Sequence, residues 1–265
     1  MPGLVGVLTT LGMVVVAPLG LLRLATPGVR RLVPFWPFAG ALAGVALLLP
    51  RGALAVALVV PYTLLALAVA LLTARRVLGW RGAEPTREMV AVFAGVALTI
   101  ACTGLVAERA GKEFLGFTLA IHGLTAAHFH YAAFAAVLVA GLTAEAARSP
   151  VARVAAWAVP LGTAVTFVGF FTGNAVELAG ATILTAGLLV TSYVLLRLRP
   201  APLVVVSALA LPATMALAMW WAGGEALGFA HPTLRQMAAT HGLLNALGVG
   251  LCGLLGWARA GSLHL

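Results

Sequence analysis

Histidine is concentrated in one short apolar stretch of this chain, the eleven residues Ile121–Tyr131. Three of the six histidines, His122, His128 and His130, fall inside it, and apolar sequence lies on both sides. An imidazole surrounded by hydrocarbon is costly unless a partner satisfies it, so such a cluster needs a reason. Imidazole binds zinc, copper or iron, and it also carries protons near neutral pH. The stretch therefore indicates either metal binding or proton transfer.

Helical spacing separates these three side chains. Residues four apart share a helix face, so His122, Ala126 and His130 form one stripe. His128 and His130 are two apart and point about 200° from each other on a regular helix. They cannot both bind one ion unless the helix is distorted. We predict that His122 and His130 face the interior and that His128 turns toward another helix.

A second stretch, Thr240–Ala246, shares the pattern His-Gly-Leu-x-x-Ala with the first. The two predicted helices run in the same direction and place their histidines at matching depth, on the order of 10 Å below one membrane boundary. A parallel internal repeat, as in some transporters, is one explanation, and chance is the other. Interhelical hydrogen bonding is the alternative for each residue alone. Together they predict one polar site, lined by His122, His130, His241 and Asn245.

Glu177 is a further candidate ligand or proton acceptor. Asn174 and Glu177 have the spacing of a capping box, with Asn174 at the N-cap and Glu177 at N3, and helix capping is the favoured interpretation. Glu225 and His231 lie in a loop that is either a gate or a solvated turn. Residues 108–113, which hold two glutamates, an arginine and a lysine, are interpreted as a solvated outer loop.

Composition defines the class of protein that carries these residues. Hydrophobic residues make up 62% of the chain and charged residues 9%, which lies outside the range of soluble domains. Repeated apolar runs of about 18 to 23 residues are typical of membrane spans. We predict an all-α integral membrane protein, a single transmembrane helical domain over residues 1–265 with no separate soluble domain. Its partner is the lipid bilayer, and the net charge of +9 indicates loop arginines, not nucleic acid.

We predict nine spans, at about 3–22, 34–49, 52–74, 88–106, 115–144, 152–172, 175–196, 201–222 and 236–257. Alternate loops then distribute the basic residues unequally between two faces, twelve against four. The positive-inside rule makes the richer face cytoplasmic, with the N-terminus outside and the C-terminus inside. The richer face carries Arg23, Arg30, Arg31, Arg75, Arg76, Arg81, Arg87, Arg148, Arg153, Arg197, Arg199 and Arg259. The other carries Arg51, Arg109, Lys112 and Arg235.

The stretch from Thr125 to Phe134 resembles the signature of YndJ-like bacterial integral membrane proteins, and the stretch from His241 to Gly248 resembles a second part of that family. The family is described as transporter-like, without an established substrate. Longer relatives carry an additional soluble region, so activity residing there is not implied for this chain. The resemblance implies shared importance of four residues, His128, His130, His241 and Asn245.

Three functions fit these observations. The first, which we favour, is a transporter-type protein of the bacterial plasma membrane, with an outward-facing intramembrane site for a small solute or ion. Its substrate-binding residues would be His122, His128, His130, His241, Asn245 and Glu177, with histidine protonation as a coupling step. The second is an intramembrane metalloenzyme acting on a lipophilic substrate, with zinc, iron or copper bound by His122, His130 and His241. The third is a non-catalytic membrane subunit whose polar residues hold helices together.

Overall fold

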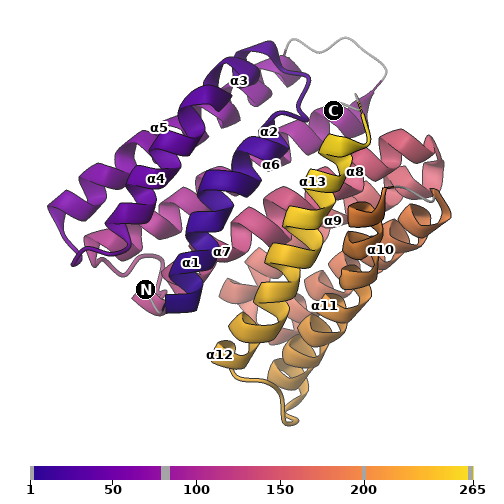
Figure 1. The fold of residues 1–265 in the computed structure, drawn as a ribbon. Helices are drawn as coiled ribbons and strands as arrows, with labels where there is room; N and C mark the ends of the chain where they lie inside the picture. Colours follow the sequence, from indigo (N-terminus) through magenta and orange to yellow (C-terminus); the bar gives the residue numbers. More distant parts are fainter. Residues whose placement is uncertain (1–2, 79–83, 199–200, 262–264) are drawn as a thin grey trace. The chain divides into compact units, whose positions relative to one another are not determined.

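The computed structural model describes residues 3–78, 84–198, 201–261 and 265. This part of the chain consists of helices and their connections (Figure 1), with an isolated bridge between Phe114 and Phe117 as its only β-type pairing. The all-α prediction is therefore confirmed. Arg81 and Arg199, which we assigned to the cytoplasmic face, lie outside the described residues.

Eight helical stretches of the described chain are long and apolar enough to cross a membrane. Each predicted span except the second corresponds to one of them, with boundaries that differ by a few residues. The chain is thus a multi-pass membrane protein. The eight stretches are Gly3–Leu21, Ala53–Leu78, Pro85–Ala110, Leu119–Ala147, Pro150–Thr172, Asn174–Leu198, Pro202–Leu227 and Leu234–Arg259.

The second predicted span, 34–49, corresponds to the end of a run of three shorter helices. They are α3 (Pro27–Leu32), the 3-10 helix η2 (Val33–Phe35) and α4 (Trp36–Ala46). Pro34 and Pro37 cannot donate backbone hydrogen bonds, which accounts for the break at this point. This run is the ninth helical region, and its crossing of the membrane stays a prediction.

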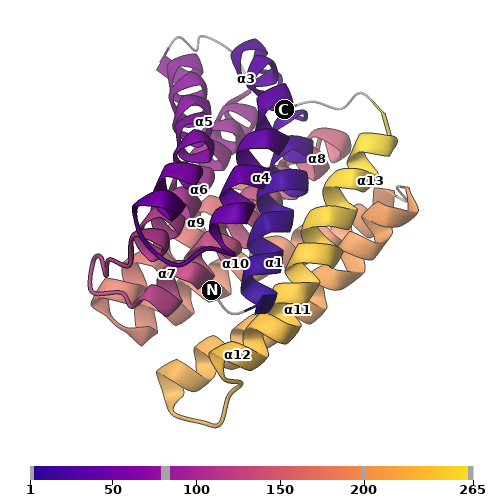
Figure 2. The same ribbon diagram turned by 60° about the vertical axis from the view of Figure 1, so that its left-hand side comes forward.

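The run from α3 to α4 lies along α5 (Ala53–Leu78) for most of that helix. Near one end, Gly28 of α3 faces Leu72 of α5 with no room for a side chain between them. At the other end, the turn after α4 leads directly into α5, and Figures 1 and 2 show the two helices side by side. The run therefore covers nearly the length of a spanning helix, which supports nine spans.

The described residues form two compact units. Unit 1 contains residues 3–135 with Leu265, and unit 2 contains residues 136–261. The boundary falls inside the stretch Leu119–Ala147, which consists of α7 (Leu119–His128), the π-helix η3 (Phe129–Ala135) and α8 (Ala136–Ala147). A single domain over residues 1–265 stays a prediction.

In unit 1, ion pairs join α5 to α6 (Pro85–Ala110) near both ends of the pair. Arg51, just before α5, contacts Glu108 in the last turn of α6 at 3.0 Å. Near the other end, Arg76 contacts Glu88 at 2.7 Å and donates to the Thr26 hydroxyl at 3.0 Å. The remaining helices of this unit are α1 (Gly3–Leu11), the π-helix η1 (Gly12–Val16) and α2 (Ala17–Leu21).

In unit 2, glycines bring α9 (Pro150–Thr172) and α10 (Asn174–Leu198) into close contact. A methyl group at Gly162 would lie 2.5 Å from the Leu184 amide nitrogen, and one at Gly187 would lie 2.6 Å from the Ala158 Cβ. Such small residues let helix backbones approach each other inside a membrane. The unit continues with α11 (Pro202–Leu227), α12 (Leu234–Met237), the π-helices η4 (Ala238–Gly242) and η5 (Leu244–Cys252), and α13 (Gly253–Arg259).

Large apolar side chains are exposed along helices of both units. Phe38 and Leu54 are examples in unit 1, and Val154 and Leu209 are examples in unit 2. In water such surfaces would be costly, whereas hydrocarbon chains solvate them. The exposed apolar side chains therefore indicate contact with a lipid bilayer.

The nine-span topology can be tested with a reporter protein fused after Leu265. Because nine crossings put the two termini on opposite sides, and because arginine collects on the predicted inner face, the reporter should be active only in the cytoplasm. A reporter active only outside the cytoplasm would show that the α3–α4 run does not cross.

The packing of α9 on α10 predicts that Gly162→Ala destabilises the protein. The added methyl group collides with the Leu184 backbone, and overpacking of this kind costs about 1–3 kcal/mol. Thermal unfolding of the purified protein in detergent measures the change. Gly3→Ala is the matched control, because a methyl group at Gly3 meets nothing within 4 Å. Equal midpoints for both variants would contradict this account of the packing.

Candidate functional site

His130 and Tyr62 form a hydrogen-bonded pair inside unit 1. Both residues are fully buried, and the Tyr62 hydroxyl lies 2.6 Å from the His130 Nε2. The other ring nitrogen, Nδ1, lies 2.6 Å from the Ala126 carbonyl oxygen. A carbonyl only accepts, so Nδ1 carries the proton and Nε2 accepts from the tyrosine. The pair is therefore a buried phenol and a neutral imidazole.

Neighbouring residues restrict the positions of Tyr62 and His130. Trp36 stands edge-on to the Tyr62 ring, with 5.2 Å between ring centroids. Tyr131 donates its hydroxyl to the Leu8 carbonyl at 2.6 Å. Gly12 leaves the space for His130, because a methyl group at Gly12 would lie 2.9 Å from the His130 Cβ. The packing thus leaves the imidazole little freedom to turn.

Unit 2 contains a comparable arrangement around His241. Its Nδ1 lies 2.9 Å from the Thr214 carbonyl oxygen, and its Nε2 lies 2.8 Å from the Asn245 amide nitrogen. The carbonyl fixes the proton on Nδ1, so Nε2 accepts from Asn245. The predicted proximity of His241 and Asn245 is found, and the partner on the facing helix is Thr214.

The polar groups of both units coincide with π-helical segments. A π turn pairs carbonyl i with amide i+5, and such turns are frequent at functional sites. His130 lies in η3, His241 in η4 and Asn245 in η5. Side chains donate to carbonyls in or just before these segments, which compensates for altered backbone pairing where no water is present. The four acceptors are the carbonyls of Leu8, Ala126, His241 and Val249, whose donors are Tyr131, His130, Thr214 and Ser207.

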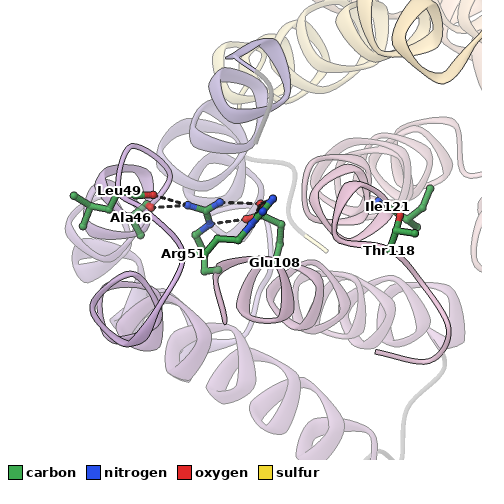
Figure 3. Close-up of polar contacts among 7 residues, drawn as sticks. Ala46, Leu49, Arg51, Glu108, Thr118 and Ile121 are labelled. Carbon is green, nitrogen blue, oxygen red and sulfur yellow. Dashed lines mark hydrogen bonds and ion pairs between the residues drawn. The ribbon is translucent and has the colours of Figure 1, made fainter. Parts of the chain in front are cut away.

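His122 lies nearer its helix end than the sequence predicted. It is the fourth residue of α7, whereas His241 is the eighth residue of its stretch, and their equal depth in the membrane stays a prediction. Its Nε2 accepts from the Phe114 amide at 3.1 Å, and its ring stacks on the Phe114 ring. His122 therefore holds the loop before α7. The N-cap there is Thr118, which accepts from the Ile121 amide (Figure 3).

The predicted stripe on this helix is present. His122, Ala126 and His130 are buried, whereas His128 between them is exposed. His122 and His130 nevertheless have separate hydrogen-bond partners. One shared site for His122, His130, His241 and Asn245, and substrate binding by His128, stay predictions.

The capping interpretation of Glu177 is wrong. Asn174 is itself the first residue of α10, and its amide nitrogen donates to the Glu225 carbonyl of α11 at 2.8 Å. Gly173, with φ of 134°, makes the turn before the helix and accepts from the Glu177 amide. Asn174 thus connects two helices, and the Glu177 carboxylate is left for another role.

The solvated-loop interpretation of residues 108–113 is half wrong. Lys112 and Glu113 are exposed, but α6 continues to Ala110 and buries Glu108 and Arg109 almost completely. The error comes from ending the span at residue 106, four residues too early. Glu108 and Arg109, which we expected in a solvated loop, therefore belong to a buried network of charged groups.

The Glu108 carboxylate accepts from two guanidinium groups, as Figure 3 shows. Arg109 donates to it at 2.8 Å and Arg51 at 3.0 Å. Arg109 also donates to the carbonyls of Ala46 and Leu49, each at 3.0 Å. Ala46 is the last residue of α4 and Leu49 lies in the turn after it, where a helix leaves carbonyls without partners in the helix. The network therefore links the end of α4, the start of α5 and the end of α6 at one end of unit 1.

The described residues contain no ready-made cluster of metal-binding side chains. No group of three His, Cys, Asp or Glu side chains there is arranged to hold a metal ion. Both ring nitrogens of His130 and of His241 already take part in hydrogen bonds. A metal at either imidazole would have to displace one of those partners.

Sequence reasoning missed Tyr62 and Thr214, the partners of the two buried histidines. Tyr62 is one of only three tyrosines and stands alone within an apolar run, which is a usable signal. Thr214 has none, because threonine is common in membrane helices and most bond to their own backbone, as Thr143 does here.

Apolar spanning helices with internally paired polar groups define this chain as a polytopic helical membrane protein. The chain belongs to the YndJ-like protein family, whose family model matches residues 7–249. Comparison with curated proteins and with solved structures gave no significant match.

The Glu108 network predicts that Glu108→Gln lowers stability markedly. Removing one partner from a buried ion pair leaves the other charge uncompensated, which costs about 3–5 kcal/mol. Glu113→Gln, an exposed carboxylate in the following loop, is the matched control and should change little. Thermal unfolding of both variants measures the difference, and a Glu108→Gln midpoint equal to the parent would contradict the assignment.

Proposed function

We propose that this protein is a transporter that binds a small solute or ion inside the membrane and couples its movement to protonation of a buried histidine. The observation that carries the proposal is the hydrogen bond between Tyr62 and His130. The bond is 2.6 Å long and completely buried, and it joins a phenol and an imidazole from two different apolar helical stretches. Ionisable residues in that environment are expensive and are usually functional.

The Tyr62–His130 pair can take up a proton with little rearrangement. In the neutral pair, Tyr62 donates and His130 Nε2 accepts. If Nε2 gains a proton it becomes a donor, and the tyrosine oxygen can accept after a rotation of its hydroxyl hydrogen. The Ala126 carbonyl continues to accept from Nδ1 in both states. The heavy atoms can stay in place while the charge of the pair changes by one.

His241 supports the same chemistry in unit 2. Its neutral Nε2 accepts from Asn245, so protonation there would require the Asn245 amide to present its oxygen instead. Thr214 keeps the other nitrogen bonded. Turning over the Asn245 amide is a larger change than rotating the Tyr62 hydroxyl. Protonation at His241 would therefore be coupled to movement of the Asn245 side chain.

The location follows from the arginine distribution. Twelve basic residues against four favour a plasma-membrane protein of bacterial type with its arginine-rich loops in the cytoplasm. On that topology, the helix ends that carry His122 and Glu177 lie toward the outside, which supports an outward-facing site.

A structural role is the second candidate, and one observation favours it. Side chains at the π-helical segments satisfy backbone carbonyls, so the same residues would be needed merely to fold the helices. An intramembrane metalloenzyme has less support. It would have to take ring nitrogens of His130 and His241 away from their present partners.

Tyr62→Phe tests the transporter, because it removes only the hydroxyl that bonds to His130. Proteoliposomes loaded with a pH-sensitive dye would be screened with a panel of small solutes for solute-driven proton movement. We expect the parent to respond to at least one solute and Tyr62→Phe to reduce that rate tenfold or more.

Tyr193→Phe is the matched control for this experiment. Tyr193 is 57% exposed on α10 and stacks under Arg197, far in sequence from the buried pair. Its variant should transport like the parent. If the parent moves no solute, or if Tyr62→Phe keeps the parental rate and loses only thermal stability, the structural role is correct instead.

A further inference from the structure

Glu177 is a buried carboxylate without a compensating partner. The residue is only 8% exposed, and its carboxylate makes no hydrogen bond or ion pair within the described chain. Glu225 lies at the same end of unit 2, because its backbone carbonyl accepts from the side-chain amide of Asn174, three residues before Glu177. A buried carboxylate is costly unless it keeps its proton or a cation neutralises it.

Helix packing holds Glu177 in this place. The backbone at Glu177 packs directly on Gly169 of α9, where there is no room for a Cβ. On the other side, Ser192 donates to the Ala208 carbonyl at 2.6 Å, which fixes the antiparallel register of α10 and α11. The carboxylate is therefore confined to the contact between α9, α10 and α11.

Asn174 supplies an amide oxygen at the same end of α10. The Asn174 amide nitrogen is turned to the Glu225 carbonyl, which leaves the Asn174 Oδ1 as a free acceptor. The Glu225 side chain is 39% exposed, so it links the buried Glu177 to the surface. Two carboxylates and an amide oxygen, completed by water, are the ligands that hard cations prefer.

The loop from Gly228 to Pro232 folds back over this end of α11. His231 packs on Gly224 and its Nε2 lies 3.3 Å from a Glu225 carboxylate oxygen. Trp220 donates to the Ala230 carbonyl at 2.9 Å, which ties the loop to the helix. A cation bound by Glu225 would therefore compete with His231 for this carboxylate.

We propose that Glu177 and Glu225, with the Asn174 amide oxygen, bind a hard divalent cation at this end of unit 2. Two carboxylates match the charge of one such ion. Carboxylate and amide oxygens favour a hard cation over a transition metal. Binding would draw Glu225 away from His231 and release the loop. This inference does not depend on the Tyr62–His130 pair that carries the transporter proposal, although Glu177 is among the residues predicted to bind the transported solute.

Terbium luminescence tests the site, because Tb³⁺ replaces Ca²⁺ at oxygen ligands and emits when a nearby tryptophan is excited. Trp220 and Trp221 are close to the loop, and the Trp221 ring lies 6.4 Å from the His231 ring. Purified parent protein should give saturable emission that Ca²⁺ displaces. Glu177→Gln should weaken Tb³⁺ binding tenfold or more. His231→Ala should keep or strengthen it, because it removes the competitor for Glu225.

Two controls make the outcome decisive. Glu177→Gln keeps the side-chain shape and breaks no hydrogen bond, so its thermal midpoint should equal or exceed that of the parent, which separates lost binding from lost folding. Glu113→Gln should bind Tb³⁺ like the parent. Unchanged binding in Glu177→Gln, or an equal loss in Glu113→Gln, would overturn the site. Tyr62→Phe should still bind Tb³⁺, so failure of the transporter proposal can be told apart from failure of this one.

Discussion

The structure depends on one constraint, that a polar group inside an apolar helix must find its partner within the chain. Hydrocarbon offers no hydrogen bonds, so each unpaired group would cost free energy comparable to a lost bond or more. Unit 1 meets this constraint with Arg51, Arg76 and Arg109, whose guanidinium groups neutralise Glu108 and Glu88 near the ends of α5 and α6. The charges that stand at these helix ends therefore fasten the helices together.

The same constraint explains why the buried histidines coincide with π-helical segments. A π turn changes which amide reaches each carbonyl, and an imidazole or a hydroxyl then supplies the missing donor. His130 does this for Ala126, and Thr214 does it for the carbonyl of His241. A ring nitrogen that bonds to the backbone also fixes the tautomer, so the opposite nitrogen is presented to Tyr62 or Asn245. Structural pairing and proton chemistry thus require the same residues, and only a variant that changes one hydroxyl can distinguish them.

Hydropathy predicted the helices well because the length of an apolar run is a property of sequence alone. The burial of His122 and His130 also followed from helical spacing, whereas the exposure of His128 did not, because we predicted that it turns toward another helix. What failed depended on neighbours far away in sequence. Glu108 was assigned to solvent because nothing near it shows that Arg51 will come to meet it. Glu177 was assigned to a cap because its three-residue spacing from Asn174 is a local pattern, whereas the partner of Asn174 is Glu225, which is 51 residues away.

Glu177 is informative because it departs from the rule that the other buried charges obey. Glu108 and Glu88 each face an arginine, and the paired charges give stability without needing any ligand. Glu177 shares its end of unit 2 with Glu225 instead, although the chain has fifteen arginines that could have supplied a partner. Helix packing around Gly169 holds it there at a cost in stability. Glu225 has His231 beside it, so on our cation-binding proposal it is Glu177 whose positive partner comes from outside the chain.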